Sequence, residues 1–367
     1  MTLKTVADRV GVSAMTVSNA FSRPDQLSAA LREKILAAAA ELGYVGPDPA
    51  ARTLARGATG TVGILLTESP QYAFSDEFST TFLAAITQEL ARTGLALTLL
   101  PSGRAGDVIP ARDVAMDGAL AYSCRPGIDG VEWLRRRRLP LVFVDQQPEP
   151  GCTSINVDDR AAAAGAARHV VDLGHRRIAL LTVGLGSDAA EAGSSDFLVA
   201  RQRLSGWLDV LGPAGIEPAV LRSEVSTQED GLAAVRDVLT GPDRPTAVLC
   251  FSDALAGGVV RAAEDAGLRV PQDLSVVGYD DTPLARRMRP ALTTVHQDAA
   301  EKGRLAAAEL AAAVARHRAG LRPEVRHVVL PTELVVREST GPAPDSPRGI
   351  TPRADPFRSP TNPVIED

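Results

Sequence analysis

The sequence predicts an α/β protein with a small N-terminal three-helix helix-turn-helix head and a two-lobed body of parallel sheets flanked by helices. Two observations carry this prediction. Residues 1–46 place apolar side chains at helical spacing, with short turns between the helical segments. From residue 61 onward, apolar strand-like runs alternate with amphipathic helical segments, which is typical of parallel sheets covered on both faces. At 367 residues, the chain is long enough for two or three domains.

Composition and charge are those of a soluble globular protein with an uneven charge distribution. Apolar residues make up 45% of the chain and charged residues 23%, and the net charge is −6. Residues 1–58 hold seven Lys/Arg and five Asp/Glu, which gives +2 and leaves −8 for the rest. A slightly basic head on an acidic body is compatible with nucleic-acid binding by the head.

Several classes of protein are disfavoured by what the sequence lacks. No signal peptide and no apolar run long enough to span a bilayer are visible, so we expect a cytoplasmic protein without membrane contact. Cys124, Cys152 and Cys250 are far apart, and no metal-binding spacing is visible, so we expect no metal or other cofactor. The first strand runs into "GILLTESPQ" rather than a glycine-rich phosphate loop, which argues against kinase or dehydrogenase chemistry.

The head shows the start and stop signals of three helices. The first helix follows Thr2 as its cap, and Gly11 allows the tight turn after it. Ser13 is placed to cap the second helix, and the third runs from Ser28 to a stop at Gly43. Three helices with a short turn between the first two predict a helix-turn-helix.

The second helix of the head, "AMTVSNAF", has an unusual exposed face. An ordinary surface helix would carry Lys and Glu there, but this one offers small, neutral, hydrogen-bonding side chains. Such side chains suit a helix that must lie close against another molecule. The residues concerned are Ala14, Met15, Thr16, Ser18 and Asn19.

The body follows a linker and ends in a proline-rich tail. We expect a DNA-binding domain over 1–46, a hinge helix or linker over 47–60, an effector-binding and dimerisation core over 61–340, and a disordered tail over 341–367, which has seven prolines. The core is expected to divide into lobe 1, about 61–157 and 298–320, and lobe 2, about 158–297 and 321–338. Helices are predicted at Phe78–Arg92, Arg160–Leu173, Arg201–Leu211, Gly231–Leu239 and Ala254–Ala266.

These motifs resemble those of the lactose-repressor (LacI/GalR) family of bacterial transcription regulators. The resemblance is carried in the head by "TLKTVADRVGVSAMTVSNAFS", "LREKILAAAAELGY" and "ARTLARG". It continues in the body through "DLGHRRIALL", "ARQRLSGW", "FSDALAGGVVRAAEDAGLRVPQDLSVVGYDD" and "LTTVHQ". It implies a periplasmic-binding-protein-like body, a homodimer, a near-palindromic operator in double-stranded DNA, and a small effector, a sugar by expectation, that controls a repressor.

The resemblance also assigns DNA contacts to residues of the head and linker. It implies that Ala14, Met15 and Asn19 read bases in the major groove, while Ser13, Thr16 and Ser18 contact phosphates. Leu54 matches a leucine that wedges into the minor groove, flanked by Arg52 and Arg56. From Tyr44 to Leu54 the chain is one residue longer than is common in the family, so the register of the hinge helix stays open.

Effector contacts are expected in a cleft between the lobes. Arg203 in "ARQRLSGW" matches a family arginine, and Asp280 in "VGYDD" ends a strand, where open α/β sheets bind ligands. An Arg and an Asp facing each other can bind hydroxyl groups, or simply pair with each other. Asp253 is expected to cap the helix that starts at Ala254. The other residues expected to line the cleft are Ser252, Gln297, Phe74 and Tyr72.

The sequence leaves some alternatives open. Ser226 stands where some sugar-responsive relatives carry a stacking aromatic residue, so a nucleoside or an unusual polyol remains an alternative effector. A solute-binding or sugar-binding protein would share the body, and an α/β enzyme acting on a small carbohydrate or nucleoside would share the cleft. The sequence does not distinguish induction from corepression, or a dimer from a higher oligomer.

Overall fold

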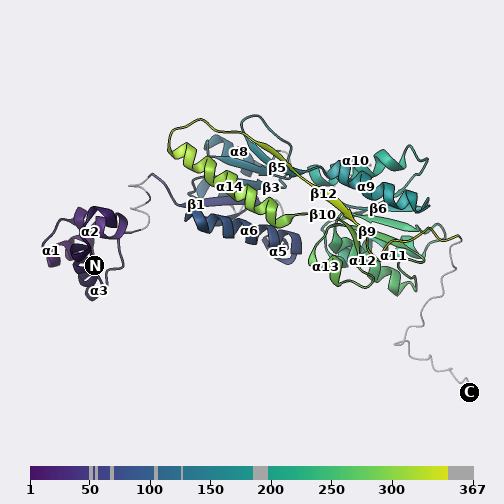
Figure 1. Cartoon of the computed structure of the whole chain (residues 1–367), viewed down its shortest axis with the longest axis horizontal. Coiled ribbons are helices and arrows are strands. Elements are labelled where there is room, and N and C mark those ends of the chain that lie inside the picture. The colour runs from purple at the N-terminus through teal and green to yellow at the C-terminus, as the bar shows by residue number, and fades with distance from the viewer. Residues whose placement is uncertain are drawn as a thin grey trace, which may run out of the picture. The chain divides into compact units, whose positions relative to one another are not determined.

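The computed structural model describes residues 1–48, 53, 57–66, 70–102, 106–124, 127–184 and 197–345, with the backbone alone at Pro24 and at 70–72. The chain forms two compact units (Figure 1). The first contains Met1–Gly60 and Ala115–Asp117, and the second contains Thr61–Val114 and Gly118–Asp367. Arg52, Leu54 and Arg56 of the predicted hinge, and 346–367 of the predicted tail, lie outside the described residues.

The head is a three-helix unit, as the sequence predicts. Its helices start where a hydroxyl side chain caps them, because the side chains of Thr2, Ser13 and Ser28 each accept a bond from a backbone N–H of the first turn. Gly11, with φ of +77°, makes the turn after the first helix. The elements are α1 (Leu3–Val10), α2 (Ala14–Ser22), the 3₁₀ helix η1 (Pro24–Gln26) and α3 (Ala29–Glu41).

The first sheet of the body has six parallel strands in the order β11-β5-β4-β3-β1-β2. Apolar side chains of α6 and α14 cover one face, among them Phe82 and Leu310, which belong to one buried cluster with Ile64. Gly130 of α8 lies against Leu65, which points to the opposite face. The strands are β1 (Thr61–Leu66), β2 (Ala96–Pro101), β3 (Ala119–Tyr122), β4 (Leu141–Val144), β5 (Thr153–Val157) and β11 (His327–Leu330). The helices are α5 (Pro70–Ser75), α6 (Glu77–Thr93), α7 (Pro110–Asp113), α8 (Asp129–Arg136) and α14 (Ala299–Arg318).

The second sheet has the order β12-β10-β9-β8-β6-β7, with β12 antiparallel to β10 and the other pairs parallel. Alternate residues of β6 point into two separate cores: Leu180 packs with Trp207 of α10, and Leu181 packs with Val259 of α12. The strands are β6 (Ile178–Val183), β7 (Ala219–Ser223), β8 (Ala247–Cys250), β9 (Ser275–Asp280), β10 (Thr293–Gln297) and β12 (Thr332–Val335). The helices are α9 (Asp159–Asp172), α10 (Leu198–Leu211), α11 (Gln228–Thr240), α12 (Asp253–Asp265) and α13 (Pro283–Arg287).

The structure differs from the predicted boundaries in two places. Residues 321–338 were expected in lobe 2, but β11 pairs with β5 of the first sheet, and only β12 joins the second sheet. Two short strands that are adjacent in the sequence therefore belong to different lobes. The hydrophobic pattern predicts that each is a strand, but not which sheet it joins. The predicted disordered tail begins too early, because the N–H groups of Gly341 and Ala343 bond to Ser275 and Leu173.

Membrane insertion finds no support in the described part of the chain. Across those residues, no helix combines the length and the apolar character that crossing a bilayer requires.

Candidate functional site

The exposed end of α2 is the feature of the head that sequence analysis assigned to DNA. Val17 and Ala20 are buried in the head's core, which fixes the face that α2 turns outward. On that outer face Ala14 is exposed, and Met15 is 70% exposed. The helix therefore offers a small side chain and a flexible apolar one at its N-terminal end.

The polar residues of α2 have local partners. The Ser13 hydroxyl accepts from the Thr16 N–H at 3.1 Å and lies 2.8 Å from the Thr16 hydroxyl. Ser18 and Asn19 are half-buried, and Asn19 Nδ2 donates to Gln26 Oε1 at 3.2 Å. An Asn19 side chain that contacts a base would exchange this bond for one to DNA.

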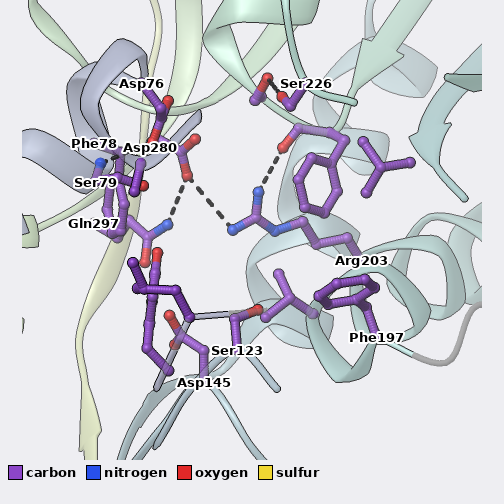
Figure 2. A pocket seen from close by; sticks show the side chains of 17 residues that line it. Asp76, Phe78, Ser79, Ser123, Asp145, Phe197, Arg203, Ser226, Asp280 and Gln297 are labelled. Carbon is purple, nitrogen blue, oxygen red and sulfur yellow. Dashed lines mark hydrogen bonds and ion pairs between the residues drawn. The ribbon is translucent and has the colours of Figure 1, made fainter. Parts of the chain in front are cut away.

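A pocket of about 790 Å³, including its opening, lies between the two lobes of the body (Figure 2). It is walled by the carboxyl ends of parallel strands from both sheets, where open α/β sheets bind ligands. Four of the predicted effector residues line it: Arg203, Ser252, Asp280 and Gln297.

Arg203, which lines the pocket, is held in place by three acceptors. Its Nε donates to Asp159 Oδ1 at 2.8 Å, and another nitrogen reaches the Phe251 carbonyl oxygen. A third nitrogen lies 3.5 Å from Asp280 Oδ1 (Figure 2). Burial disfavours the charge, but Asp159 and Asp280 together raise the Arg203 pKa above its ordinary value. Arg203 is therefore a permanent, preorganised cation.

Asp280 ends β9 and points toward both Arg203 and Gln297. Gln297 Nε2, at the end of β10, donates to Asp280 Oδ1 at 2.6 Å. Burial raises the pKa of Asp280 to about 6, against the opposing effect of Arg203. Its backbone has a φ of +103°, an uncommon conformation for a residue with a side chain, and such strain clusters at functional sites.

Ser252 lines the pocket as predicted, and it also takes the capping role that the sequence suggested for Asp253. The Ser252 hydroxyl, not the Asp253 carboxylate, caps α12 by accepting from the Leu255 N–H at 3.2 Å. Asp253 is the first residue of the helix, and it accepts from the Thr282 N–H at 2.7 Å and from the Thr294 hydroxyl at 2.6 Å. The capping prediction for Asp253 is therefore wrong by one residue, because Ser and Asp cap equally well.

The prediction for Phe74 is contradicted, and the one for Tyr72 falls outside what is described. Phe74 is 60% exposed and does not line the pocket, whereas its neighbour Ala73 is buried and does. One residue along a helix turns the side chain by about 100°, so α5 can direct only one of the two inward. The side chain of Tyr72 lies outside the described residues.

Sequence reasoning missed several pocket residues. Asp145 comes directly after β4, just as Asp280 ends β9. The strand-end argument that pointed to Asp280 therefore applies equally to Asp145 in "LVFVD". Asp76 caps α6, accepting from the Ser79 N–H at 2.8 Å, and also faces the pocket. Burial raises the pKa of both carboxyl groups. The aromatic rings in the wall gave no sequence signal, and they are Phe78, Tyr122, Phe197 and Phe251.

This pocket is built for hydrogen bonding to a small polar ligand. Carboxylates, an amide and a guanidinium suit hydroxyl groups, and aromatic rings suit the apolar faces of a ring or chain. Within the described ranges, no group of three or more His, Cys, Asp or Glu side chains is arranged to hold a metal ion.

Two family profiles match the chain. The profile described as bacterial regulatory proteins, lacI family, matches residues 2–46, and that of a periplasmic binding protein-like domain matches 167–340. The HTH-type transcriptional regulator IpsA of Corynebacterium glutamicum is 38% identical over 320 residues, covering 82% of this chain and 88% of its own.

Two solved structures show the same similarity over more than nine tenths of the chain. A Lac repressor dimer bound to operator and the anti-inducer ONPF has a TM-score of 0.75 at 28% identity, covering 93% of this chain and 99% of that one. A complex of the transcriptional regulator CelR with cellobiose has a TM-score of 0.64 at 29% identity, covering 92% and 99%.

Proposed function

Since the chain belongs to the LacI family of bacterial transcriptional regulators, we propose that it is a sequence-specific repressor whose operator affinity is controlled by a small effector bound between the lobes of the body. One observation carries this proposal: a helix-turn-helix head shares a chain with a preorganised polar pocket at the carboxyl ends of two sheets. A repressor acts where its DNA is, so the proposed location is the cytoplasm. No catalytic step is proposed.

Base reading is assigned to Ala14, Met15 and Asn19. The exposure of Ala14 and Met15 supports this role, because both can pack on a thymine methyl group once α2 lies in the major groove. Asn19 can donate and accept together on the edge of adenine. Ser13, Thr16 and Ser18 are assigned to phosphates, which fix the position of the head without reading sequence.

The hinge assignment rests on sequence similarity. Leu54 is proposed to wedge between base pairs in the minor groove, with Arg52 and Arg56 along the groove or the phosphates. Leu54→Ala is then expected to reduce DNA bending and specific affinity while sparing nonspecific binding.

The proposed effector is a sugar or a related metabolite that binds Arg203, Asp280, Ser252 and Gln297. Convergence of these four side chains on one pocket supports the assignment, as does the cellobiose complex of the related CelR. The chain is proposed to act as a homodimer, because a two-fold dimer presents two recognition helices to the half-sites of a near-palindrome. A Lac repressor dimer bound to operator, with a similar fold, supports this arrangement.

Selection of the full-length protein against random duplex DNA tests the proposed function. Enrichment of one near-palindromic sequence at moderate salt is expected, followed by a change in its Kd on addition of effector. If no sequence is enriched with or without added metabolites, the head does not read DNA and the proposal fails.

A further inference from the structure

Lys302 is an unusual residue in this sequence. The chain has three lysines, Lys4, Lys34 and Lys302, against 36 arginines. The body therefore has a single lysine, and its side chain is 1% exposed. A buried ammonium group is costly unless it is paired and hydrogen-bonded, so its surroundings explain its presence.

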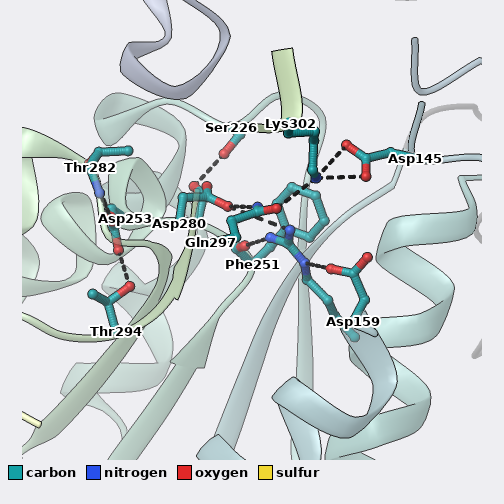
Figure 3. A network of polar contacts seen from close by, with 12 residues as sticks. Asp145, Asp159, Ser226, Phe251, Asp253, Asp280, Thr282, Thr294, Gln297 and Lys302 are labelled. Atoms are coloured by element: carbon teal, nitrogen blue, oxygen red, sulfur yellow. Dashed lines mark hydrogen bonds and ion pairs between the residues drawn. The ribbon is translucent and has the colours of Figure 1, made fainter. Parts of the chain in front are cut away.

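Lys302 does not line the pocket itself, but it contacts two residues that do, Asp145 and Gln297 (Figure 3). Its Nζ donates to Asp145 Oδ1 at 2.7 Å, Asp145 Oδ2 at 3.0 Å and Gln297 Oε1 at 2.7 Å. It also lies 5.3 Å from the centre of the Phe78 ring. An ammonium group has three N–H donors, and these three bonds use them all. Lys302 therefore acts on a ligand through its neighbours rather than by contact.

The three acceptors of Lys302 come from both lobes. Lys302 lies in the first turns of α14, which packs on the first sheet, and Asp145 follows β4 of the same sheet. Gln297 ends β10 of the second sheet. The Lys302–Gln297 bond therefore crosses from one lobe to the other next to the effector pocket.

Lys302 determines how the Gln297 amide presents itself. The ammonium group only donates, so the atom facing it must be Oε1, and Nε2 is then directed at Asp280. The second N–H of Gln297 has no partner among the residues that the structure describes, so it can donate to a ligand. Arginine would not substitute, because its planar fork cannot direct three bonds from one nitrogen to three converging oxygens.

Charges around the pocket favour an uncharged ligand. In the part of the chain that the structure describes, three carboxylates line it, those of Asp76, Asp145 and Asp280. Among the described lining residues Arg203 is the one cation, and Asp159 and Asp280 already partner it. Lys302 neutralises Asp145 from behind. Among the described lining residues, a phosphate or carboxylate group would face these carboxylates without a free cation, whereas hydroxyl groups can donate to them.

We propose that Lys302 is the positioning residue that adapts this pocket to an uncharged polyhydroxylated effector, by fixing the Asp145 carboxylate and the Gln297 amide. This inference rests on the proposed binding of the effector in this pocket. It makes Lys302 a determinant of effector affinity, although Lys302 does not contact the effector.

Ligand class is tested by calorimetry and thermal shift on the full chain with paired probes. The uncharged probes are D-glucose, D-ribose, D-mannitol and cellobiose, and the charged counterparts are glucose 6-phosphate, ribose 5-phosphate, mannitol 1-phosphate and cellobiose 6′-phosphate. We expect an uncharged probe to bind at least tenfold more tightly than its phosphorylated counterpart. Equal or tighter binding of a phosphorylated probe, or no binding by any uncharged probe, overturns the inference.

The role of Lys302 is tested with Lys302→Met, which removes the charge, and Lys302→Arg, which keeps it. We expect both variants to bind the probe at least tenfold more weakly than the unchanged chain. Arg304→Met is the matched control on the same helix, because Arg304 forms an exposed pair with Glu301, and we expect its affinity to stay within twofold. If Lys302→Arg or Lys302→Met also stays within twofold, positioning by Lys302 is refuted.

A spectroscopic measurement keeps the inference testable if these variants fold poorly. Isotope labelling of lysine side chains gives signals from three lysines, and the Lys302 signal is expected to shift on saturation with the probe at the same Kd. An unshifted signal overturns the inference. Operator binding is measured on the same samples. If the protein binds the probe through Lys302 but does not bind DNA, the proposed function is refuted while the inference about Lys302 stands.

Discussion

At the scale of single residues, the pocket depends on charged groups held where water cannot compete for them. Arg203 and Asp145 are each less than a tenth exposed, and each is tied to a partner of opposite charge. Removing one partner of such a buried pair lowers the free energy of unfolding by about 3–5 kcal/mol. Substitutions at these positions therefore affect folding as well as binding, so milder changes are more informative about the effector.

Effector affinity is expected to increase with pH through the titration of Asp280. Its pKa of about 6 is raised by burial, and hydroxyl donors bind the ionised form. With that pKa, the Asp280 carboxyl group is ionised in roughly one tenth of the molecules at pH 5 and in about nine tenths at pH 7. The effector Kd should therefore fall by about tenfold over this range. Calorimetric titration at pH 5, 6 and 7 measures this. In Asp280→Asn the dependence should become weaker, and what remains belongs to Asp76 and Asp145, whose pKa values burial also raises. A wild-type Kd that is flat or rises with pH contradicts the prediction.

Asn19 is expected to contribute to base specificity. Asn19→Ala should weaken operator binding by about 1–3 kcal/mol and relax the preference at one base pair, because the amide pairs with a base edge. Competition binding against operators with single base changes measures both effects. Equal weakening on every sequence would identify Asn19 as a backbone contact instead.

At the scale of elements, the close approach of α6 and α14 holds the first lobe together beneath the pocket. Gly303 makes this approach possible, because a Cβ there would lie 2.4 Å from the Phe82 carbonyl oxygen. Gly303→Ala should therefore destabilise the body by about 1–3 kcal/mol through forced separation of the helices. The thermal unfolding midpoint of the full chain measures this. Gly165→Ala, in α9 with no atom within 4 Å of the added Cβ, is the control and should leave the midpoint unchanged or raise it. Equal midpoints for the two variants would contradict the argument.

The elements could be predicted from the sequence more fully than the contacts between them. Strands and helices show themselves by local patterns of apolar residues, and helix starts by caps such as Ser13 and Ser28. Both signals depend only on residues that are close together in the sequence. Arg203 and Asp280 could also be found, because motif similarity and the strand end both pointed to them. Lys302 could not, because its partners Asp145 and Gln297 are distant in sequence or belong to another lobe, and a lysine on a helix reads as an exposed residue.

At the scale of the whole molecule, the chain passes between the sheets after β5, after β10 and between β11 and β12. Hydrogen bonds next to these crossings, such as Lys302 to Gln297, connect the lobes beside the pocket. An effector that binds one arrangement of the lobes more tightly than another shifts the molecule toward that arrangement. The strength of the shift is limited by the difference between the two affinities.

Coupling between the effector and the operator is expected to be reciprocal. If the effector changes the operator Kd by a factor of about 5–150, the operator must change the effector Kd by the same factor and in the same direction, because both belong to one thermodynamic cycle. Four titrations of the full chain measure this, each ligand being titrated in the absence and at saturation of the other. Arg304→Met should preserve the factor, while Lys302→Met should lower effector affinity in both states of the protein. If the operator leaves the effector Kd unchanged while the effector alters operator binding, the two ligands are not acting on one equilibrium of the lobes.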